Sequence, residues 1–295
     1  MNARLFVGDQ RVAEGADSVL ASGRGFAYGD GVFETMRAVG GVIPWWPGHR
    51  ARLLLGTARL RIALPSVECI DTELHDWLSI HRDAVVKLVI TRGSGGRAYA
   101  PAPDAPPVWM LSVSTLPPPL RPGGLVLRWC ETRLARQPLL AGLKHCNRLE
   151  QIMARAEWSD PDIDEGLMLD TEGDVISATA ANLFVLREGR WWTPPLDRCG
   201  IAGVCRSWAL RAFAASERRL RVDEVETADA VVLCNAVRGI LPVARLGDRA
   251  WSPHPAVAEA RRRLAVAHPA FDHISIHVAS TDIASTDVAQ NEDAP

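Results

Sequence analysis

Apolar and polar residues alternate in short stretches through the first 115 residues of the chain, which is the period of a β-strand with one buried face. Pro47 then opens an apolar repeat at helical spacing that carries His49 and Arg52 on one face. The predicted strands span residues 4–7, 11–13, 32–39, 42–46, 85–91 and 108–114, and a second helix is predicted at 72–80. The glycine-dense residues 24–31 are expected to form a tightly bent loop. These elements predict a mixed α+β first domain.

Two proline clusters, at residues 101–107 and 117–122, separate this region from a second mixture of strands and helices. Because proline-rich segments form extended spacers, we expect the second cluster to link two domains. The later elements are predicted strands at 125–130 and 231–234, hairpins pairing 166–169 with 175–179 and 182–186 with 191–193, and helices at 147–158, 203–215 and 256–267. The expected organisation is a small N-terminal α+β domain at 1–116, a linker at 117–123, a larger C-terminal mixed α/β domain at 124–275, and a disordered polar tail at 276–295.

The composition is that of an ordinary globular protein, and it argues against several functional classes. The 295 residues are 47% hydrophobic and 23% charged, and the formal net charge of −2 favours neither nucleic acid nor an anionic membrane as a partner. We expect neither a secretory leader nor a membrane span, because no apolar run approaches the required length. The cysteines at positions 69, 130, 146, 199, 205 and 234 lack zinc-type spacing, so we expect reduced thiols, a cytoplasmic location and no metal site.

Lysine is nearly absent from this arginine-rich chain. Of its 33 basic residues only Lys87 and Lys144 are lysines, which leaves 31 arginines. An arginine cannot lose its proton in a protein, whereas a lysine amine can do so and condense with an aldehyde. Lys144 lies between a Gly-Leu pair and a predicted helix, where a strand end or loop can present its amine to a cavity. The alternative is a solvated surface lysine.

Two further segments contain residues suited to binding anions. The stretch Gly-Ile-Ala-Gly-Val-Cys-Arg at 200–206 opens a predicted helix, and the free amides and dipole of a helix N-terminus attract phosphate. Arg52 is a candidate partner of the same phosphate. Arg92 and Arg97 border a glycine-rich loop suited to binding a carboxylate. The alternative for residues 200–206 is a plain connection between elements, and the alternative for Arg92 and Arg97 is a solvated hairpin tip. An exceptional lysine, a phosphate seat and carboxylate-binding arginines together indicate pyridoxal phosphate as the cofactor.

Five short motifs follow one another along the chain. They are Phe-Ala-Tyr-Gly-Asp-Gly-Val-Phe-Glu-Thr at 26–35, His-x-x-Arg-Leu at 49–53, Lys-His-x-Asn-Arg-Leu-Glu-Gln at 144–151, Ala-Asn-Leu-Phe at 181–184 and Gly-x-x-Gly-x-x-Arg at 200–206. The class IV aminotransferase family of fold type IV pyridoxal-phosphate enzymes has similar motifs in the same order, and the sequence resembles that family over about residues 4–270. The resemblance implies a two-domain fold like that of D-amino-acid aminotransferase.

The resemblance also implies an activity. The motif at 144–151 and the loop Thr-Arg-Gly-Ser-Gly-Gly-Arg at 91–97 look most like the lyase members, which eliminate pyruvate from 4-amino-4-deoxychorismate to make p-aminobenzoate for folate. The alternative is a D-amino-acid or branched-chain aminotransferase on the same fold. Family members are usually homodimers with each site near the interface, so a homodimer is expected.

Individual roles are carried over from the family by position. Lys144 matches the lysine that forms the Schiff base with the cofactor and shuttles protons, and Thr35 is a candidate proton donor. The residues expected to hold the cofactor are Lys144, Arg52, Ser177, Val204, Cys205, Asn235 and Ala236. The residues expected on the substrate side are Thr35, Arg97, Arg92 and Tyr28.

The family pattern is broken at Ser177. The family usually has a glutamate five residues before the asparagine of Asn-Leu-Phe, where it keeps the pyridine nitrogen protonated. A neutral hydroxyl supports a pyridinium far less than a carboxylate does, so we hypothesise that Ser177 favours elimination over transamination. The alternatives are a weakened enzyme, a silent cofactor-binding protein, or substitution of the glutamate by Asp174 or Glu172.

Overall fold

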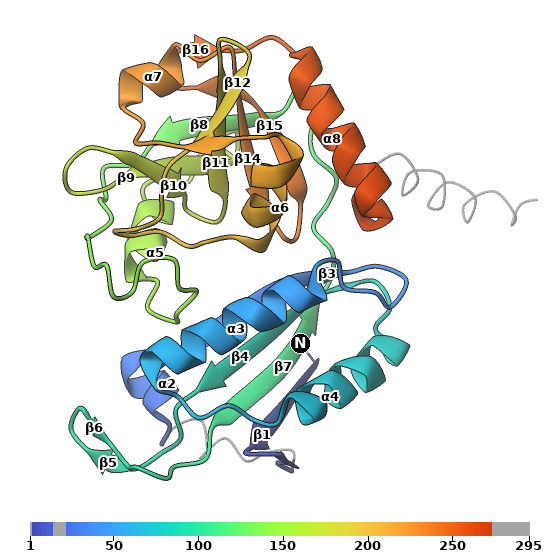
Figure 1. Ribbon diagram of the computed structural model, residues 1–295, viewed down its shortest axis with the longest axis vertical. Coiled ribbons are helices and arrows are strands. Elements are labelled where there is room, and N and C mark those ends of the chain that lie inside the picture. The colour runs from blue at the N-terminus through green and yellow to red at the C-terminus, as the bar shows by residue number, and fades with distance from the viewer. Residues whose placement is uncertain (1, 14–21, 273–295) are drawn as a thin grey trace, which may run out of the picture.

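The computed structural model describes residues 2–13 and 22–272, and its two large β-sheets share no strand within these residues (Figure 1). The five-stranded sheet uses the chain up to Ser114, and the nine-stranded sheet begins at Leu125. This arrangement confirms the predicted two-domain α+β fold. The predicted domain boundaries, with the linker at 117–123 between the sheets, stay a prediction, and the predicted disordered tail at 276–295 lies outside the described residues.

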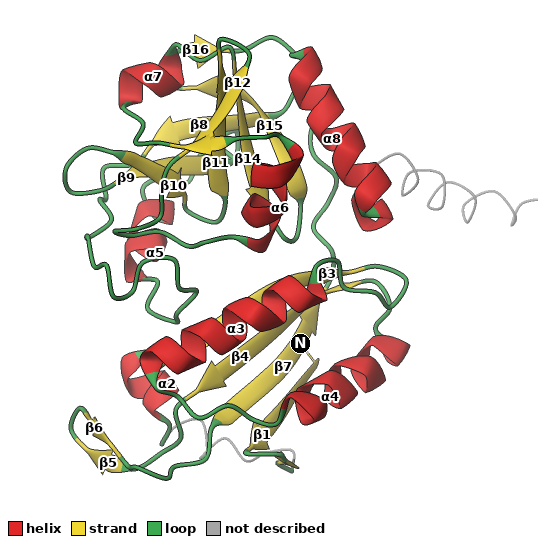
Figure 2. Ribbon diagram, in the orientation of Figure 1, coloured by secondary structure: helices red, strands yellow, loops and turns green. Residues whose placement is uncertain are grey.

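The first sheet has the strand order β2-β1-β7-β4-β3, and two helices cover one of its faces (Figure 2). Its antiparallel strands are β1 (Asn2–Val7), β2 (Gln10–Arg11), β3 (Gly31–Ala38), β4 (Ala84–Thr91) and β7 (Val108–Ser114). The covering helices are α3 (Trp46–Leu60) and α4 (Val67–Ile80). Since side chains alternate along a strand, Val32 and Met36 of β3 enter the core under these helices while Phe33 and Thr35 face away.

Several predictions for the first half are corrected. Residues 24–31 contain one helical turn, α2 (Arg24–Tyr28), because Gly29 takes a left-handed conformation and its N–H closes the turn. Residues 42–46 form no strand: pairing ends after one bridge, Val39 to Val42, and Pro44 has no N–H to extend it. Helix α4 begins five residues earlier than expected, since the Ser66 side chain caps it. The glycine-rich loop leads into a small hairpin, β5 (Gly96–Arg97) and β6 (Ala100–Pro101).

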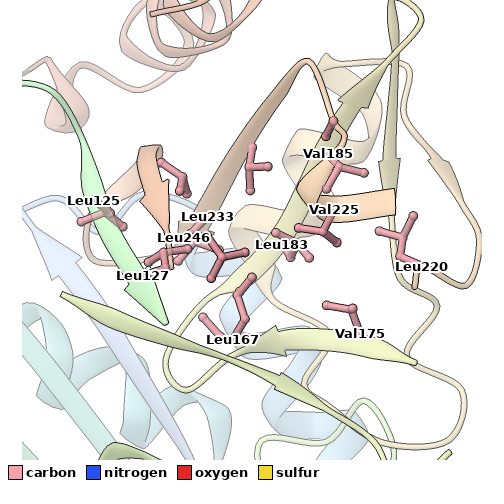
Figure 3. Close-up of a cluster of buried hydrophobic side chains, with 14 of the residues drawn as sticks. Leu125, Leu127, Leu167, Val175, Leu183, Val185, Leu220, Val225, Leu233 and Leu246 are labelled. Atoms are coloured by element: carbon pink, nitrogen blue, oxygen red, sulfur yellow. The ribbon is translucent and has the colours of Figure 1, made fainter. Parts of the chain in front are cut away.

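The second sheet closes on itself. Strands β10, β9, β8, β15, β14 and β11 pair in this order and β10 also pairs with β11, which makes a six-stranded ring. Its interior is filled by apolar side chains that include Leu127, Leu167, Leu183 and Leu233 (Figure 3). The strands are β8 (Leu125–Trp129), β9 (Glu165–Leu169), β10 (Val175–Ala178), β11 (Asn182–Arg187), β14 (Ala230–Asn235) and β15 (Gly239–Leu246), with β12 (Arg190–Thr193), β13 (Ser216–Glu217) and β16 (Arg249–Ala250) outside the ring. Strand β15 was missed because Pro242 interrupts its pattern.

Helices pack around this ring. They are α5 (Leu149–Arg155), α6 (Val204–Ala212), α7 (Val222–Glu226) and α8 (Pro255–Ala267), followed by the 3-10 turn η1 (Pro269–Phe271). One of them, α6, also contacts α3 of the first half. Helices α5 and α6 are shorter than predicted, and α7 was not predicted. Hydrogen bonds join the two halves: Arg37 Nε donates to the Ala270 carbonyl at 2.7 Å and Arg59 Nη1 to the Ala141 carbonyl at 2.9 Å. No helix in the described part of the chain is long and apolar enough to cross a membrane.

Candidate active site

A cavity of about 330 Å³ lies between the two halves of the molecule. Its wall is formed by β3, α3, the segment that leads into α5, the β10–β11 turn, the start of α6 and the end of β14. The predicted site residues on this wall are Thr35, Arg52, Lys144, Ser177, Val204, Asn235 and Ala236. The side chain of Cys205 is instead buried in the core, although its backbone directly follows Val204. The fold therefore collects residues from six separate segments in one place.

Lys144 reaches this cavity because its segment pairs with the edge of the first sheet. Phe33 donates its N–H to the Lys144 carbonyl at 2.9 Å, and Cys146 donates to the Gly31 carbonyl at 2.8 Å. The Lys144 amine lies 4.1 Å from the centroid of the Phe33 ring. Burial and the nearby positive charge of Arg52 lower the pKa of Lys144 to about 7, so much of this amine is unprotonated at neutral pH. Such an amine can act as a nucleophile or as a general base.

A buried carboxylate orients Arg52. Glu34 is 1% exposed, and its two oxygens accept from Arg52 Nε at 2.8 Å and Nη2 at 2.5 Å. Burial raises the pKa of Glu34, but the hydrogen bonds and charge of Arg52 outweigh it and hold that pKa below its ordinary value. Burial also lowers the pKa of His49, whose neutral ring contacts Glu34 through Nδ1 at 2.7 Å. Arg52 Nη1 donates to the Ala202 carbonyl at 3.0 Å, which brings it to the start of α6.

The N-terminus of α6 and the loop after β14 fit a phosphate group. No side chain caps the first amides of α6, and Gly203 at its N-cap must lack a Cβ, because that atom would lie 2.1 Å from Asn182 Oδ1. Asn235 Oδ1 accepts the amides of Val237 and Arg238 at 3.0 and 2.8 Å, which makes the adjoining loop a tight turn. A phosphate monoester requires hydrogen-bond donors and positive charge. The free amides at the start of α6 and Arg52 supply the donors, and the helix dipole and Arg52 supply the charge, so the residues present fit pyridoxal phosphate.

The wall near Ser177 contains no acidic side chain. Ser177 lies on β10 and is 8% exposed. Asp174 accepts from Arg136 at 2.9 Å and pairs with two further arginines, and the Glu172 side chain is 66% exposed. Neither carboxylate lines the cavity, and neither does any other Asp or Glu of the described residues. The proposal that Asp174 or Glu172 replaces the family's glutamate therefore has no support in this structure.

Three predicted substrate-side residues lie outside the cavity of their own chain. The guanidinium of Arg92 binds Asp30 and the Leu60 and Arg61 carbonyls at the end of α3, so it is occupied by a structural role. Arg97 lies on the exposed β5–β6 hairpin, and Tyr28 contacts the neighbouring Tyr99 ring at 5.6 Å. None of the three lines the cavity that contains Lys144.

Sequence reasoning missed several residues on or behind the wall. Glu34, Phe33, Arg148 and Gln151 all belong to the recognised motifs, but a motif does not reveal which of its side chains face a cavity. The alternation of β3 is the one signal that could have separated Phe33 and Thr35, on one face, from Glu34 on the other.

The chain is similar to a family model, to characterised proteins and to solved structures. A model described as Amino-transferase class IV matches residues 31–246. An aminodeoxychorismate lyase of Vibrio harveyi is 34% identical over 75% of this chain and 84% of its own length, and a putative branched-chain-amino-acid aminotransferase of Methanocaldococcus jannaschii is 28% identical over 83% and 88%. The crystal structure of 4-amino-4-deoxychorismate lyase from Pseudomonas aeruginosa is 40% identical, with a TM-score of 0.82 over 88% of this chain and 98% of that one.

Proposed function

Because the chain belongs to the amino-transferase class IV family, we propose that it eliminates pyruvate from 4-amino-4-deoxychorismate and so produces p-aminobenzoate. Its cofactor is pyridoxal phosphate, as the sequence predicted. The substrate is supported by the similarity to the two lyases, which exceeds that to the aminotransferase. The observation that carries the chemistry is Lys144, an amine with a pKa of about 7 on the wall of the cavity.

The reaction requires one proton to be removed and one to be added. When bound, pyridoxal phosphate supplies an aldehyde that takes up the substrate amine and a ring that withdraws electrons from the neighbouring carbon. The Lys144 amine takes the proton from the ring carbon that bears the nitrogen. The C–O bond of the enolpyruvyl ether breaks, the departing enolate gains a proton and leaves as pyruvate, and the remaining ring becomes aromatic. The elimination consumes no water and no oxidant, and Thr35 is the proposed donor to the leaving group.

The remaining site residues hold the cofactor in this proposal. Arg52 and the backbone amides of Val204 and Cys205 bind the phosphate, and the loop at Asn235 and Ala236 closes over it. Support comes from the hydrogen bonds of Arg52: Glu34 and the Ala202 carbonyl accept from three of its five N–H groups, which leaves one on Nη1 and one on Nη2 for the phosphate.

Ser177 is proposed to favour elimination over transamination. Transamination depends most on a protonated pyridine nitrogen, which a carboxylate stabilises and a hydroxyl does not. The absence of an acidic side chain from the cavity wall, within the described residues, supports this assignment.

We further propose a homodimer in the cytoplasm. The face of the first sheet opposite α3 and α4 carries Leu5, Val89 and Met110, which are only partly buried. The β5–β6 hairpin projects from the molecule with Tyr99 81% exposed, and Arg24 steadies it through the Ala98 and Tyr99 carbonyls. In the proposed dimer this hairpin brings Arg97 to the cavity of the second copy. The six unpaired cysteines are consistent with a reducing compartment.

The decisive experiment uses the cofactor-loaded protein and enzymatically generated 4-amino-4-deoxychorismate. Equimolar release of p-aminobenzoate and pyruvate, lost in Lys144→Ala, is the expected result. If p-aminobenzoate does not form but a panel of amino acids yields keto acids, the protein is an aminotransferase and the proposal is wrong.

A further inference from the structure

Three buried polar atoms without a hydrogen-bond partner lie on the short segment that follows Lys144. They are His145 Nδ1, Arg148 Nε and Gln151 Oε1, half of the six such side-chain atoms found in residues 2–13 and 22–272. Leaving a buried polar atom without a partner costs about 1–3 kcal/mol, so native structures contain few of them. Three on one segment indicate that this segment binds a polar group of a ligand.

The same segment separates two cavities. Arg148 and Gln151 line the cavity that contains Lys144, and together with His145 they line a second cavity of about 230 Å³. Gly200 is also common to both. A group bound at Arg148 therefore lies at the border of the reaction cavity, with room beyond it for a small molecule.

The chemistry of this border favours a carboxylate. Arg148 forms no ion pair with any described residue, and its side-chain hydrogen bond goes to Nε2 of His145. Burial and the charge of Arg148 lower the pKa of His145 to about 4, so the ring is neutral and, because Nε2 accepts, its proton is on Nδ1. The unpaired Arg148 Nε is a donor on a positively charged group, which suits a carboxylate. His145 Nδ1 is a donor on the ring edge opposite Arg148, and Gln151 Oε1 is an acceptor, so neither is assigned to this carboxylate. The acidic Glu150 also lines the second cavity, but its Oε1 accepts the Ala135 amide at 2.8 Å.

We propose that Arg148, oriented by Nε2 of His145, forms a subsite that binds the enolpyruvyl carboxylate of the substrate, the one that leaves in pyruvate. The proposal rests on the proposed function, in which the substrate has two carboxylates. The ring carboxylate is para to the amine and points away from the reacting carbon, whereas the enolpyruvyl ether is attached to the neighbouring carbon. Since Arg148 shares the cavity wall with Lys144, it is placed for the nearer carboxylate. The second cavity is large enough for a three-carbon acid.

The test measures binding rather than turnover. The cofactor-loaded protein is titrated separately with pyruvate and with p-aminobenzoate by calorimetry, as wild type, Arg148→Gln, Arg148→Lys and Arg155→Gln. Arg155 is a matched control on α5, since it stacks on Trp158 and does not line either cavity. Arg148→Gln is expected to weaken pyruvate binding about 10- to 100-fold, the value of a charge-assisted hydrogen bond, with p-aminobenzoate unchanged. Arg148→Lys should retain most of the affinity, and Arg155→Gln all of it.

The outcomes separate this proposal from the proposed function. If Arg148→Gln weakens p-aminobenzoate and spares pyruvate, Arg148 binds the ring carboxylate and the assignment is overturned. Unchanged affinity for both acids, or loss of the cofactor itself from Arg148→Gln and Arg148→Lys alike, also refutes the subsite. A wild type that binds pyruvate through Arg148 but releases no p-aminobenzoate would sustain the subsite and refute only the lyase activity.

Discussion

Glu34→Gln is the substitution whose effect follows most directly from the structure. The two oxygens of Glu34 accept from Arg52 at Nε and Nη2, and one of them also contacts His49 Nδ1. Glutamine has nearly the same shape but one oxygen and one NH₂ group. Whichever way its amide is oriented, a donor faces another donor, and the charge of Arg52 loses its partner.

The magnitude comes from the burial of this pair. The side chains of Glu34 and Arg52 are 1% and 11% exposed, so water cannot take over the lost interaction. Removing one partner of a buried ion pair costs about 3–5 kcal/mol. For a protein of this size that corresponds to a melting temperature lower by about 6–20 °C. The cofactor should also bind more weakly, because Arg52 is no longer held toward the start of α6.

The assay is calorimetric melting of the cofactor-free protein at pH 7, with Glu73→Gln as the control. Glu73 pairs with Arg4 at 2.7 Å, but both side chains are more exposed, and such pairs contribute about 0–1 kcal/mol. Because the folded pKa of Glu34 lies below its ordinary value of 4.5, its contribution is present above that pH and is lost as the pH falls through the folded pKa. If Glu34→Gln costs no more than Glu73→Gln at pH 7, the reasoning about Arg52 is refuted.

Three other substitutions or conditions test the site. Trapping of an aldehyde by Lys144 in the cofactor-free protein, followed by borohydride reduction, should rise with pH and level off above about pH 7, because only the unprotonated amine reacts; a rate that climbs to pH 10 contradicts the lowered pKa. Ser177→Glu should move the lyase-to-transaminase ratio toward transamination, and an unchanged ratio removes the elimination hypothesis. Gly203→Ala should weaken cofactor binding, measured by fluorescence, by about 1–3 kcal/mol, since its methyl group would lie 2.1 Å from Asn182 Oδ1; full affinity would show that the turn relaxes without cost.

The sequence alone determined the general class of fold and the central chemistry. Alternation of apolar and polar residues identified β3, β4 and β7, because one face of each strand is buried under α3 and α4 and the other is less buried. The rarity of lysine singled out Lys144. Glycine and proline positions gave two wrong predictions. Gly29 ends a short helical turn, α2, where only a bent loop was predicted, and Pro242 lies within strand β15 against the usual preference of proline.

Only the tertiary structure decided how the side chains pair. The sequence placed Arg92 and Arg97 together on one loop, yet Arg92 binds Asp30 and the end of α3, some thirty to sixty residues away. Glu34 is separated from Arg52 by 18 residues, and Arg52 from Ala202 by 150. Local periodicity reports which face of an element is buried, but not which distant group meets it. That choice is made when β3, α3 and the β4–β7 connection pack together and, for Ala202, when the two halves meet, and here it separates a structural arginine from one that lines the cavity.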